Sequence, residues 1–286
     1  MEVKVYKDTR AFLDEYEMIL LEHESMSQLV LYSAYQCDRK HITEKASFGC
    51  CIKSGKPQLF FSNVTPYSMA IYLVPEEGDY ASVIALADYF GNSDIIMEGI
   101  IARIDVCKEF IEEYKKFTLH QFTEILGMDL MELRMLNELV LIHGTHRLAL
   151  PEEAKIVAEW MIDFQLEAFT IELDYQAARE RADKLISENK VYFYENKDKK
   201  VVSMAIATRK LPHGTTITYV FTPEQYRGNG YAAANIYYLS KELLERGNEF
   251  CSLFIDKKNP LSERAYEKVG YKVIDEVYEY KMIPVL

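Results

Sequence analysis

Hydrophobic and polar residues follow two different periods along the chain, and the alternation between these periods predicts a mixture of strands and helices. In the first half we predict strands at 2–6, 47–53, 57–63, 68–74, 93–98, 118–127 and 130–137. We predict helices there at 8–22, 24–36, 78–90 and 103–116. The first half is thus expected to mix α and β structure.

The second half follows the same order of elements. The predicted strands are 145–149, 190–195, 200–208, 214–222, 251–256, 271–275 and 277–283. The predicted helices are 152–170, 174–188, 231–246 and 260–269. The repetition concerns the pattern only, because the two halves do not align residue by residue. It predicts an α/β fold with a mixed central sheet, built as two tandem domains. We expect the boundary between the two domains to lie between Asn137 and Gly144.

Composition is that of a globular protein. The chain has 286 residues, of which 49% are hydrophobic and 27% charged. Its start lacks an apolar leader, and no apolar run reaches the ~18 residues that span a membrane. The five cysteines show no CxxC spacing, which indicates reduced core thiols in a cytoplasmic protein.

The net charge of −12 is unevenly distributed, with −10 in residues 1–140 and −2 in the remainder. An acidic chain repels nucleic-acid backbones, so we expect neither a nucleic-acid partner nor a membrane partner. The charge is compatible with a cationic substrate and also with a simple solvated surface.

One short turn concentrates the candidate chemistry. In TYVFTPEQYRGNGYAAANIYYL, residues 218–239, a predicted strand is followed by Arg227, Gly228, Asn229, Gly230 and a predicted helix. Glycine tolerates positive φ and lets a ligand approach the bare backbone. Backbone N–H groups at a helix start bind anions, so this turn predicts a phosphate-binding loop.

Two familiar phosphate motifs fit this chain poorly. A Walker loop needs Gly-Lys-Ser/Thr before a helix, whereas Gly55-Lys56 is followed by Pro57 in a predicted hairpin. Gly228, Gly230 and Ala233 match the GxGxxA dinucleotide fingerprint, with Asp256 ending the next strand. That fold needs further βαβ units, and too few residues follow.

A third interpretation is more specific. The run VFTPEQYRGNGYA (220–232) resembles motif A of the GNAT superfamily of N-acetyltransferases, with Gln225–Gly230 matching its Q/R-x-x-G-x-G/A loop. The run LFIDKKNPLSERAYEKVGYK (253–272) resembles motif B of that family. The order of elements over 145–283 is similar to that of the GNAT fold.

This resemblance implies a coenzyme site for acetyl-CoA. Backbone N–H groups around the glycine turn would hold the pyrophosphate, and the end of strand 214–222 would pair with the pantetheine arm. The residues implied are Val220, Phe221, Thr222, Gln225, Arg227, Gly228, Asn229, Gly230, Tyr231, Ala232, Ala233, Asn259, Ser262 and Tyr266.

The resemblance also implies roles for residues of helix 260–269. Asn259 resembles the family residue that hydrogen-bonds the pantetheine, and Tyr266 the tyrosine that protonates the departing thiolate. In this family the general base is often a glutamate on a central strand, but strand 214–222 contains no glutamate. A water chain or a carboxylate of helix 152–170, such as Glu167, is an alternative, and we assign no base.

We expect residues 141–286 to form a catalytic GNAT domain and residues 1–140 a degenerate GNAT-like domain without a coenzyme loop. The equivalent segment of the first half, Val74–Asp79, carries three carboxylates that would repel a pyrophosphate. His143 and His146 have no third ligand nearby in sequence, so we expect no metal.

The expected activity is an acyltransferase reaction, transfer of an acetyl group to a small-molecule amine such as a polyamine, an amino sugar or an antibiotic. The alternatives are a protein N-terminal acetyltransferase and a non-catalytic acyl-CoA sensor. The oligomeric state stays open between a monomer that acts as a tandem pseudo-dimer and a homodimer.

Overall fold

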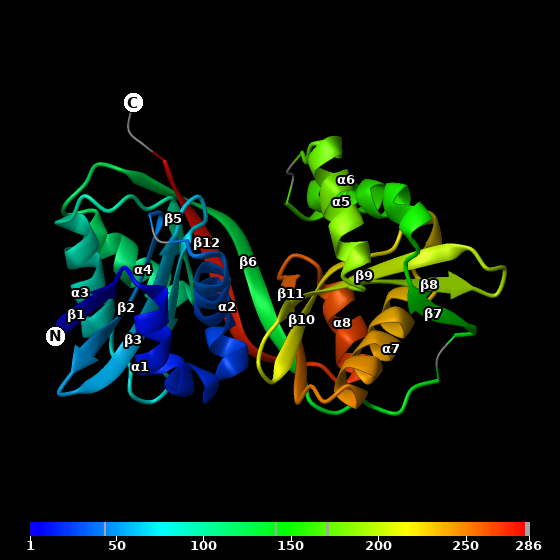
Figure 1. The fold of residues 1–286 in the computed structure, drawn as a ribbon, viewed down its shortest axis with the longest axis horizontal. Helices are drawn as coiled ribbons and strands as arrows, with labels where there is room; N and C mark the ends of the chain where they lie inside the picture. The colour runs from blue at the N-terminus through cyan, green and yellow to red at the C-terminus, as the bar shows by residue number, and fades with distance from the viewer. Residues whose placement is uncertain (43, 141, 170–171, 284–286) are drawn as a thin grey trace. The chain divides into compact units, whose positions relative to one another are not determined.

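The computed structural model describes residues 1–42, 44–140, 142–169 and 172–283. The chain forms two compact units (Figure 1). Unit 1 contains Met1–Asp129 together with the chain from Asp275 onward, and unit 2 contains Leu130–Ile274. No helix among these residues is both long and apolar enough to cross a membrane.

Unit 1 has a mixed sheet in the order β1-β2-β3-β4-β5-β12. Neighbouring strands are antiparallel except for the parallel pair β4–β5. Its strands are β1 (Glu2–Tyr6), β2 (Ala46–Lys53), β3 (Lys56–Val64), β4 (Met69–Leu73), β5 (Gly99–Ala102) and most of β12 (Lys272–Ile283). Its helices are α1 (Thr9–Leu21), α2 (Glu24–Lys40), α3 (Tyr80–Gly91) and α4 (Ile104–Tyr114).

Unit 2 repeats this arrangement, with the order β7-β8-β9-β10-β11-β6 and again a single parallel pair, β10–β11, among the registers of its described strands. Its strands are the end of β6 (Gln121–Leu133), β7 (Gly144–Leu148), β8 (Val191–Asn196), β9 (Val201–Lys210), β10 (Gly214–Phe221) and β11 (Phe250–Asp256). Its helices are η1 (Pro151–Glu153), α5 (Ala154–Phe169), α6 (Tyr175–Ser187), η2 (Glu224–Tyr226), α7 (Tyr231–Glu245) and α8 (Pro260–Val269). The mixed α/β fold and the repeated order of elements are confirmed.

The last strand of each half departs from the sequence prediction. Each half ends in one long strand, β6 or β12, where two short strands were expected. The strand expected at 93–98 is also wrong, because the strand of this region is β5, which begins at Gly99. The β12 strand adds to β5, pairing Tyr278 with Ala102. The domain boundary at 140/141 stays a prediction, since sequence repeats and compact packing units need not share limits.

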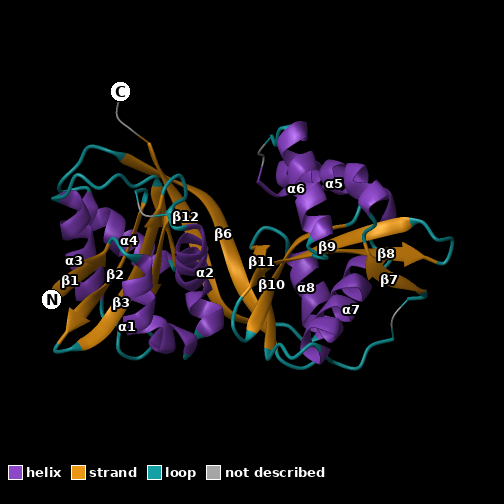
Figure 2. Cartoon of the chain, in the orientation of Figure 1, coloured by secondary structure: helices purple, strands orange, loops and turns teal. Residues whose placement is uncertain are grey.

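Each sheet is covered by helices on both faces, because neighbouring strand residues point to opposite sides (Figure 2). On β3, the Phe60 ring lies 6.3 Å from Phe12 of α1, while the Phe61 ring lies 5.5 Å from Phe90 of α3. On β8 of unit 2, Phe193 packs with α5 and α6, and Tyr192 packs with α7 and α8. The cysteines, Cys37, Cys50, Cys51, Cys107 and Cys251, are free and buried.

His146 on β7 is half-buried, and its ring stacks on Tyr192 at 5.1 Å. Neither ring nitrogen has a hydrogen-bond partner within the described structure. Burial disfavours the imidazolium ion and lowers the pKa of His146 from 6.5 to about 4. The ring is therefore neutral in the folded state at neutral pH.

We expect His146 to make unit 2 less stable in acid. Because the pKa is lower in the folded state, the unfolded chain binds a proton first as the pH falls below 6.5, and the destabilisation is complete near pH 4. At pH 5 this effect amounts to about 1–2 kcal/mol. His146→Phe keeps the stack but cannot titrate, so its stability should fall less between pH 7 and pH 5. Urea unfolding at both pH values measures the free energy of unfolding of the parent chain and the variant. An equal fall in this free energy in both proteins would contradict the prediction.

Candidate active site in unit 2

The turn between β10 and α7 has the backbone that its glycines predict. Gly228 has φ 78° and Gly230 has φ 80°, both in the left-handed region. A Cβ at Gly228 would meet no heavy atom within 4 Å, and one at Gly230 would lie 3.6 Å from Ile142. The glycines are therefore required by backbone conformation. The space above the turn is open to a ligand.

Helix α7 begins without a side-chain cap. Its N-cap is Gly230, which has no side chain that could accept a hydrogen bond from the first turn of the helix. The first N–H groups of a helix have no partner within the helix and carry part of its positive dipole. The pattern Q/R-x-x-G-x-G/A also fits two residues later than predicted, with Arg227, Gly230 and Ala232 in the fixed positions. In that register its central glycine is the N-cap of α7.

The equivalent helix of unit 1 is capped by its own carboxylate. Asp79 Oδ1 accepts a hydrogen bond from the Ser82 N–H at 3.1 Å, and Lys53 forms an ion pair with Asp79. The hydrogen bond from Lys53 lowers the pKa of Asp79, which favours the charged carboxylate. A negative group thus already occupies the place where a phosphate would bind at α3. This supports the prediction that the first half has no coenzyme loop.

Strands β10 and β11 separate as they approach this turn. Their parallel pairing extends from Gly214–Phe250 to Thr216–Ser252, although both strands continue beyond these residues. Against β9, β10 has an irregular register between Thr218 and Phe221. Tyr219 lies within this irregularity at φ 49°, a conformation that is uncommon for residues other than glycine. The backbone of β10 that faces β11 is therefore left for another partner.

Helix α8 brings the residues of the second motif next to this separation. Asn259 caps α8 by accepting a hydrogen bond from the Ser262 N–H at 3.3 Å. Tyr266, 6% exposed, belongs to the hydrophobic cluster that contains Leu253 and Ile255 of β11. Burial raises the pKa of Tyr266, and a hydrogen bond with Ser262 opposes this effect. The phenol is thus a protonated group at neutral pH, as a proton donor requires.

Two contacts between α5 and β10 or its turn were not predicted from sequence. Arg227 Nη2 forms an ion pair with Glu167, and Arg227 Nε donates to the carbonyl of Thr222 at 2.8 Å. Gln165 Nε2 donates to the hydroxyl of Tyr219 at 2.9 Å. The partners are more than fifty residues apart in the chain, and no local pattern of charge or spacing indicates them.

The structure leaves the general base unassigned. The hydroxyls of Thr216 and Thr218 on β10 lie 3.0 Å from Ser252 and 3.2 Å from Thr208, respectively. The carboxylate of Glu167 is held by Arg227. In the part of the chain that the structure describes, no cluster of His, Cys, Asp or Glu is arranged to hold a metal ion.

We expect Glu167→Gln to strengthen coenzyme A binding by two- to fivefold, because Glu167 would no longer compete with the pyrophosphate for Arg227. The effect should be small, since exposed ion pairs contribute about 0–1 kcal/mol. Glu159→Gln removes the same charge from the same helix and is the control. Titration calorimetry measures both, and weaker binding by Glu167→Gln would show that Glu167 supports the site. A large loss of kcat in this variant would identify Glu167 as the base.

The chain was compared with known proteins. The model of the acetyltransferase (GNAT) family matches residues 154–271. Similar solved structures include a GNAT-family acetyltransferase from Colwellia psychrerythraea, with 13% identity, TM-score 0.57 and coverage of 99% of this chain and 100% of that chain. A Drosophila protein has 12% identity, TM-score 0.66 and coverage of 99% and 98%. A GCN5-related N-acetyltransferase from Sphaerobacter thermophilus has 14% identity, TM-score 0.60 and coverage of 88% and 87%.

No curated protein matches. The structural similarities extend over nearly the whole chain and establish its fold, whereas the family model matches only residues 154–271. Residues 154–271 contain the uncapped α7 turn, the separation of β10 from β11 and Tyr266. Residues 154–271 are therefore an acetyltransferase domain of the GNAT family.

Proposed function

We propose that unit 2 transfers the acetyl group of acetyl-CoA to a primary amine of a small molecule, by direct attack of the amine in a ternary complex. The observation that carries the proposal is the contrast between two equivalent helices. Helix α7 starts at a glycine with its first N–H groups uncapped, and α3 starts at the carboxylate of Asp79. The first arrangement can receive a pyrophosphate, and the second repels one.

The coenzyme would be held by backbone groups. The N–H groups from Gly228 to Ala233 suit the pyrophosphate, and Arg227 adds a positive charge at the same turn. The separated edge of β10 at Val220–Thr222 would pair with the amides of the pantetheine arm, as an added strand would. The side-chain amide of Asn259, at the N-cap of α8, would hydrogen-bond the pantetheine arm.

Tyr266 would act on the leaving thiolate. Its side chain is buried in the cluster that contains Leu253 and Ile255, which follow the last residue of β11 that pairs with β10. A raised pKa keeps the proton on this oxygen until negative charge develops on the sulfur. Tyr266 then donates a hydrogen bond that is strongest in the transition state.

The acceptor would be a cationic amine. Asp163 and Glu167 are one turn apart on α5, and burial together with the charge of Glu167 raises the pKa of Asp163. Gln165 contacts β10 and Glu167 contacts the glycine turn, which supports a position of this acidic stretch beside the proposed site. Carboxylates there would attract an ammonium group from solution. The amine must lose a proton before it attacks, either to water or to one of these carboxylates.

A steady-state assay of free CoA release tests the proposal. The panel contains spermidine, glucosamine, an aminoglycoside and a short peptide with a free N-terminus. We expect turnover with at least one of the three small amines and a lower kcat/KM with the peptide. Turnover with the peptide alone would indicate a protein N-terminal acetyltransferase. Tight binding of acetyl-CoA without turnover on any amine of a wider library would favour the sensor and contradict the proposal.

A further inference from the structure

Strand β10 contains one extra residue at the point where it leaves β11. Thr218 pairs with Ile206 of β9 and Phe221 pairs with Met204, so β10 advances three residues while β9 advances two. Such a β-bulge changes the direction in which nearby side chains point, and bulges are frequent next to active sites. Tyr219 lies inside this bulge.

The bulge turns the side chain of Tyr219 away from α7. In a regular strand, residues two apart point to the same face of the sheet. Ile217 packs in the hydrophobic cluster that contains Tyr266, which lies with α7 and α8. Tyr219 packs instead in the cluster that contains Trp160 of α5. Tyr219 is therefore on the α5 side of the sheet, opposite the face on which Tyr266 is buried.

Three side chains of α5 and α6 hold the ring of Tyr219 in place. The ring centre lies 5.0 Å from that of Phe164 and 5.3 Å from the guanidinium carbon of Arg181. Gln165 donates a hydrogen bond to the Tyr219 hydroxyl at 2.9 Å. The side chain is 6% exposed, and its backbone keeps a φ of 49°. A strained conformation of this kind persists only where the surroundings over-determine it, so the ring forms a rigid wall.

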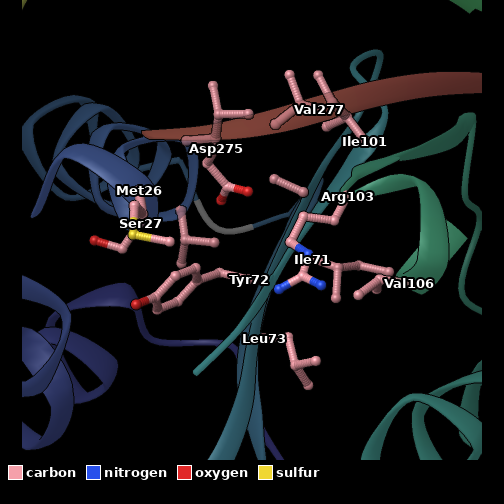
Figure 3. A pocket seen from close by; sticks show the side chains of 13 residues that line it. Met26, Ser27, Ile71, Tyr72, Leu73, Ile101, Arg103, Val106, Asp275 and Val277 are labelled. Carbon is pink, nitrogen blue, oxygen red and sulfur yellow. The ribbon is translucent and has the colours of Figure 1, made fainter. Parts of the chain in front are cut away.

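The equivalent strand of unit 1, where Asp79 closes the helix start, is built differently. In the described pairs between β4 and β3 the register has no shift. Where β4 and β5 separate, a cavity of about 30 Å³ remains, and Figure 3 shows Tyr72 and Asp275 among the side chains that line it. This volume holds about two water molecules and no coenzyme arm. The bulge thus accompanies the helix start that is open to a coenzyme.

Given the coenzyme site proposed above, we propose that the ring of Tyr219 limits the acyl group of the coenzyme to an acetyl group. The coenzyme enters from the turn before α7 and brings its sulfur next to Tyr266, on the α7 side of the sheet. The acyl group then extends through the gap between β10 and β11 toward the α5 side. There the ring of Tyr219, backed by Phe164, blocks a longer chain.

The length of the acyl chain is the quantity that Tyr219 controls. Butyryl-CoA carries two more methylene groups than acetyl-CoA, and a single methylene in a closed apolar pocket changes recognition by about 10–200-fold. Protein interiors are densely packed, and the contacts of Tyr219 with α5 and α6 leave its ring little freedom to move. The longer chain must displace the ring or leave the gap, and either event weakens binding.

Titration calorimetry of the full chain with CoA, acetyl-CoA and butyryl-CoA tests this limit without an acceptor amine. CoA has no acyl group, so its affinity is the reference for both thioesters. We expect acetyl-CoA to bind within threefold of CoA, and butyryl-CoA at least tenfold more weakly than acetyl-CoA. If CoA binds but butyryl-CoA binds as tightly as acetyl-CoA, the role of Tyr219 is overturned and the coenzyme site stands. A chain that binds none of the three contradicts the proposed function and this limit together.

Variants assign the limit to the ring. Tyr219→Gly removes the ring and suits the positive φ, so the difference between the two thioesters should shrink to less than threefold. An undiminished difference in this variant overturns the proposal. Tyr219→Phe is the matched control, because it loses only the hydrogen bond from Gln165 and should keep the tenfold difference.

A second variant covers the case in which Tyr219→Gly does not fold. Phe164→Leu removes part of the ring that backs Tyr219, so the wall can yield and the difference should shrink severalfold. A purely structural role for Phe164 would lower the melting temperature without changing the ratio of the two affinities. An unchanged ratio in Phe164→Leu then overturns the proposal.

Discussion

Tyr266→Phe should lower kcat by one to three orders of magnitude while the acetyl-CoA dissociation constant changes less than threefold. The hydroxyl meets the sulfur only as negative charge develops there, so its removal withdraws an interaction specific to the transition state. A positioned acid typically contributes 10²–10⁴-fold, or ~3–5 kcal/mol of barrier. The phenylalanine ring fills the same place among Leu253 and Ile255, so the melting temperature should barely move.

Tyr271→Phe is the matched control for this experiment. Tyr271 is buried, its ring lies 6.2 Å from that of Tyr266, and its hydroxyl lies 2.8 Å from Ser240. Losing that hydrogen bond should cost about 1 kcal/mol of stability and leave kcat intact. If Tyr266→Phe keeps kcat within a factor of two on a verified substrate, its phenol only packs, and another group protonates the thiolate.

Gly228→Glu and Gly230→Glu should each weaken acetyl-CoA binding by at least tenfold, about 1.4 kcal/mol. Both positions have a positive φ that glutamate adopts only with strain. The new carboxylate would also lie at the start of α7, where Asp79 lies at the start of α3. The substitution therefore gives unit 2 the feature that closes the equivalent site of unit 1.

Gly247→Glu separates strain from charge repulsion at the site. Gly247 has φ 91°, and a Cβ there would also meet no heavy atom within 4 Å. It follows α7, at the opposite end of that helix from Gly230. This variant should lose similar stability and keep its coenzyme affinity. Calorimetry that finds unchanged affinity in the Gly228 and Gly230 variants would refute the assignment of the turn.

Local patterns in the sequence were sufficient for most elements and for the turn. Strand β10, the glycine turn and α7 follow from an alternating run, two glycines and a 3.6-residue period. Each of these signals depends on neighbours a few residues away. Gly228 and Gly230 show the positive φ that their residue type predicts.

Features that depend on distant partners could not be predicted. The whole strand expected at 93–98 was misplaced, because the short strand β5 (Gly99–Ala102) is defined by pairing with β4 and β12 and not by its own pattern. The pairing of Glu167 with Arg227 joins segments sixty residues apart. The cavity around Tyr72 draws Asp275 from the far end of the chain. Side-chain periodicity carries no information about such contacts.

The place of β12 has a consequence for the order in which the protein can mature on the ribosome. Residues 1–129 of unit 1 are synthesised before unit 2, yet the sheet of unit 1 includes Tyr278–Lys281, which are synthesised after unit 2. All of unit 2 is translated before that strand emerges. A nascent chain that has made only the first 129 residues exposes the edge of β5, and unpaired edges invite association with other chains. Unit 1 therefore cannot close before unit 2 has been translated, and a stop after Ile274 would remove most of β12 from unit 1 while leaving the matched segment 154–271 in the chain.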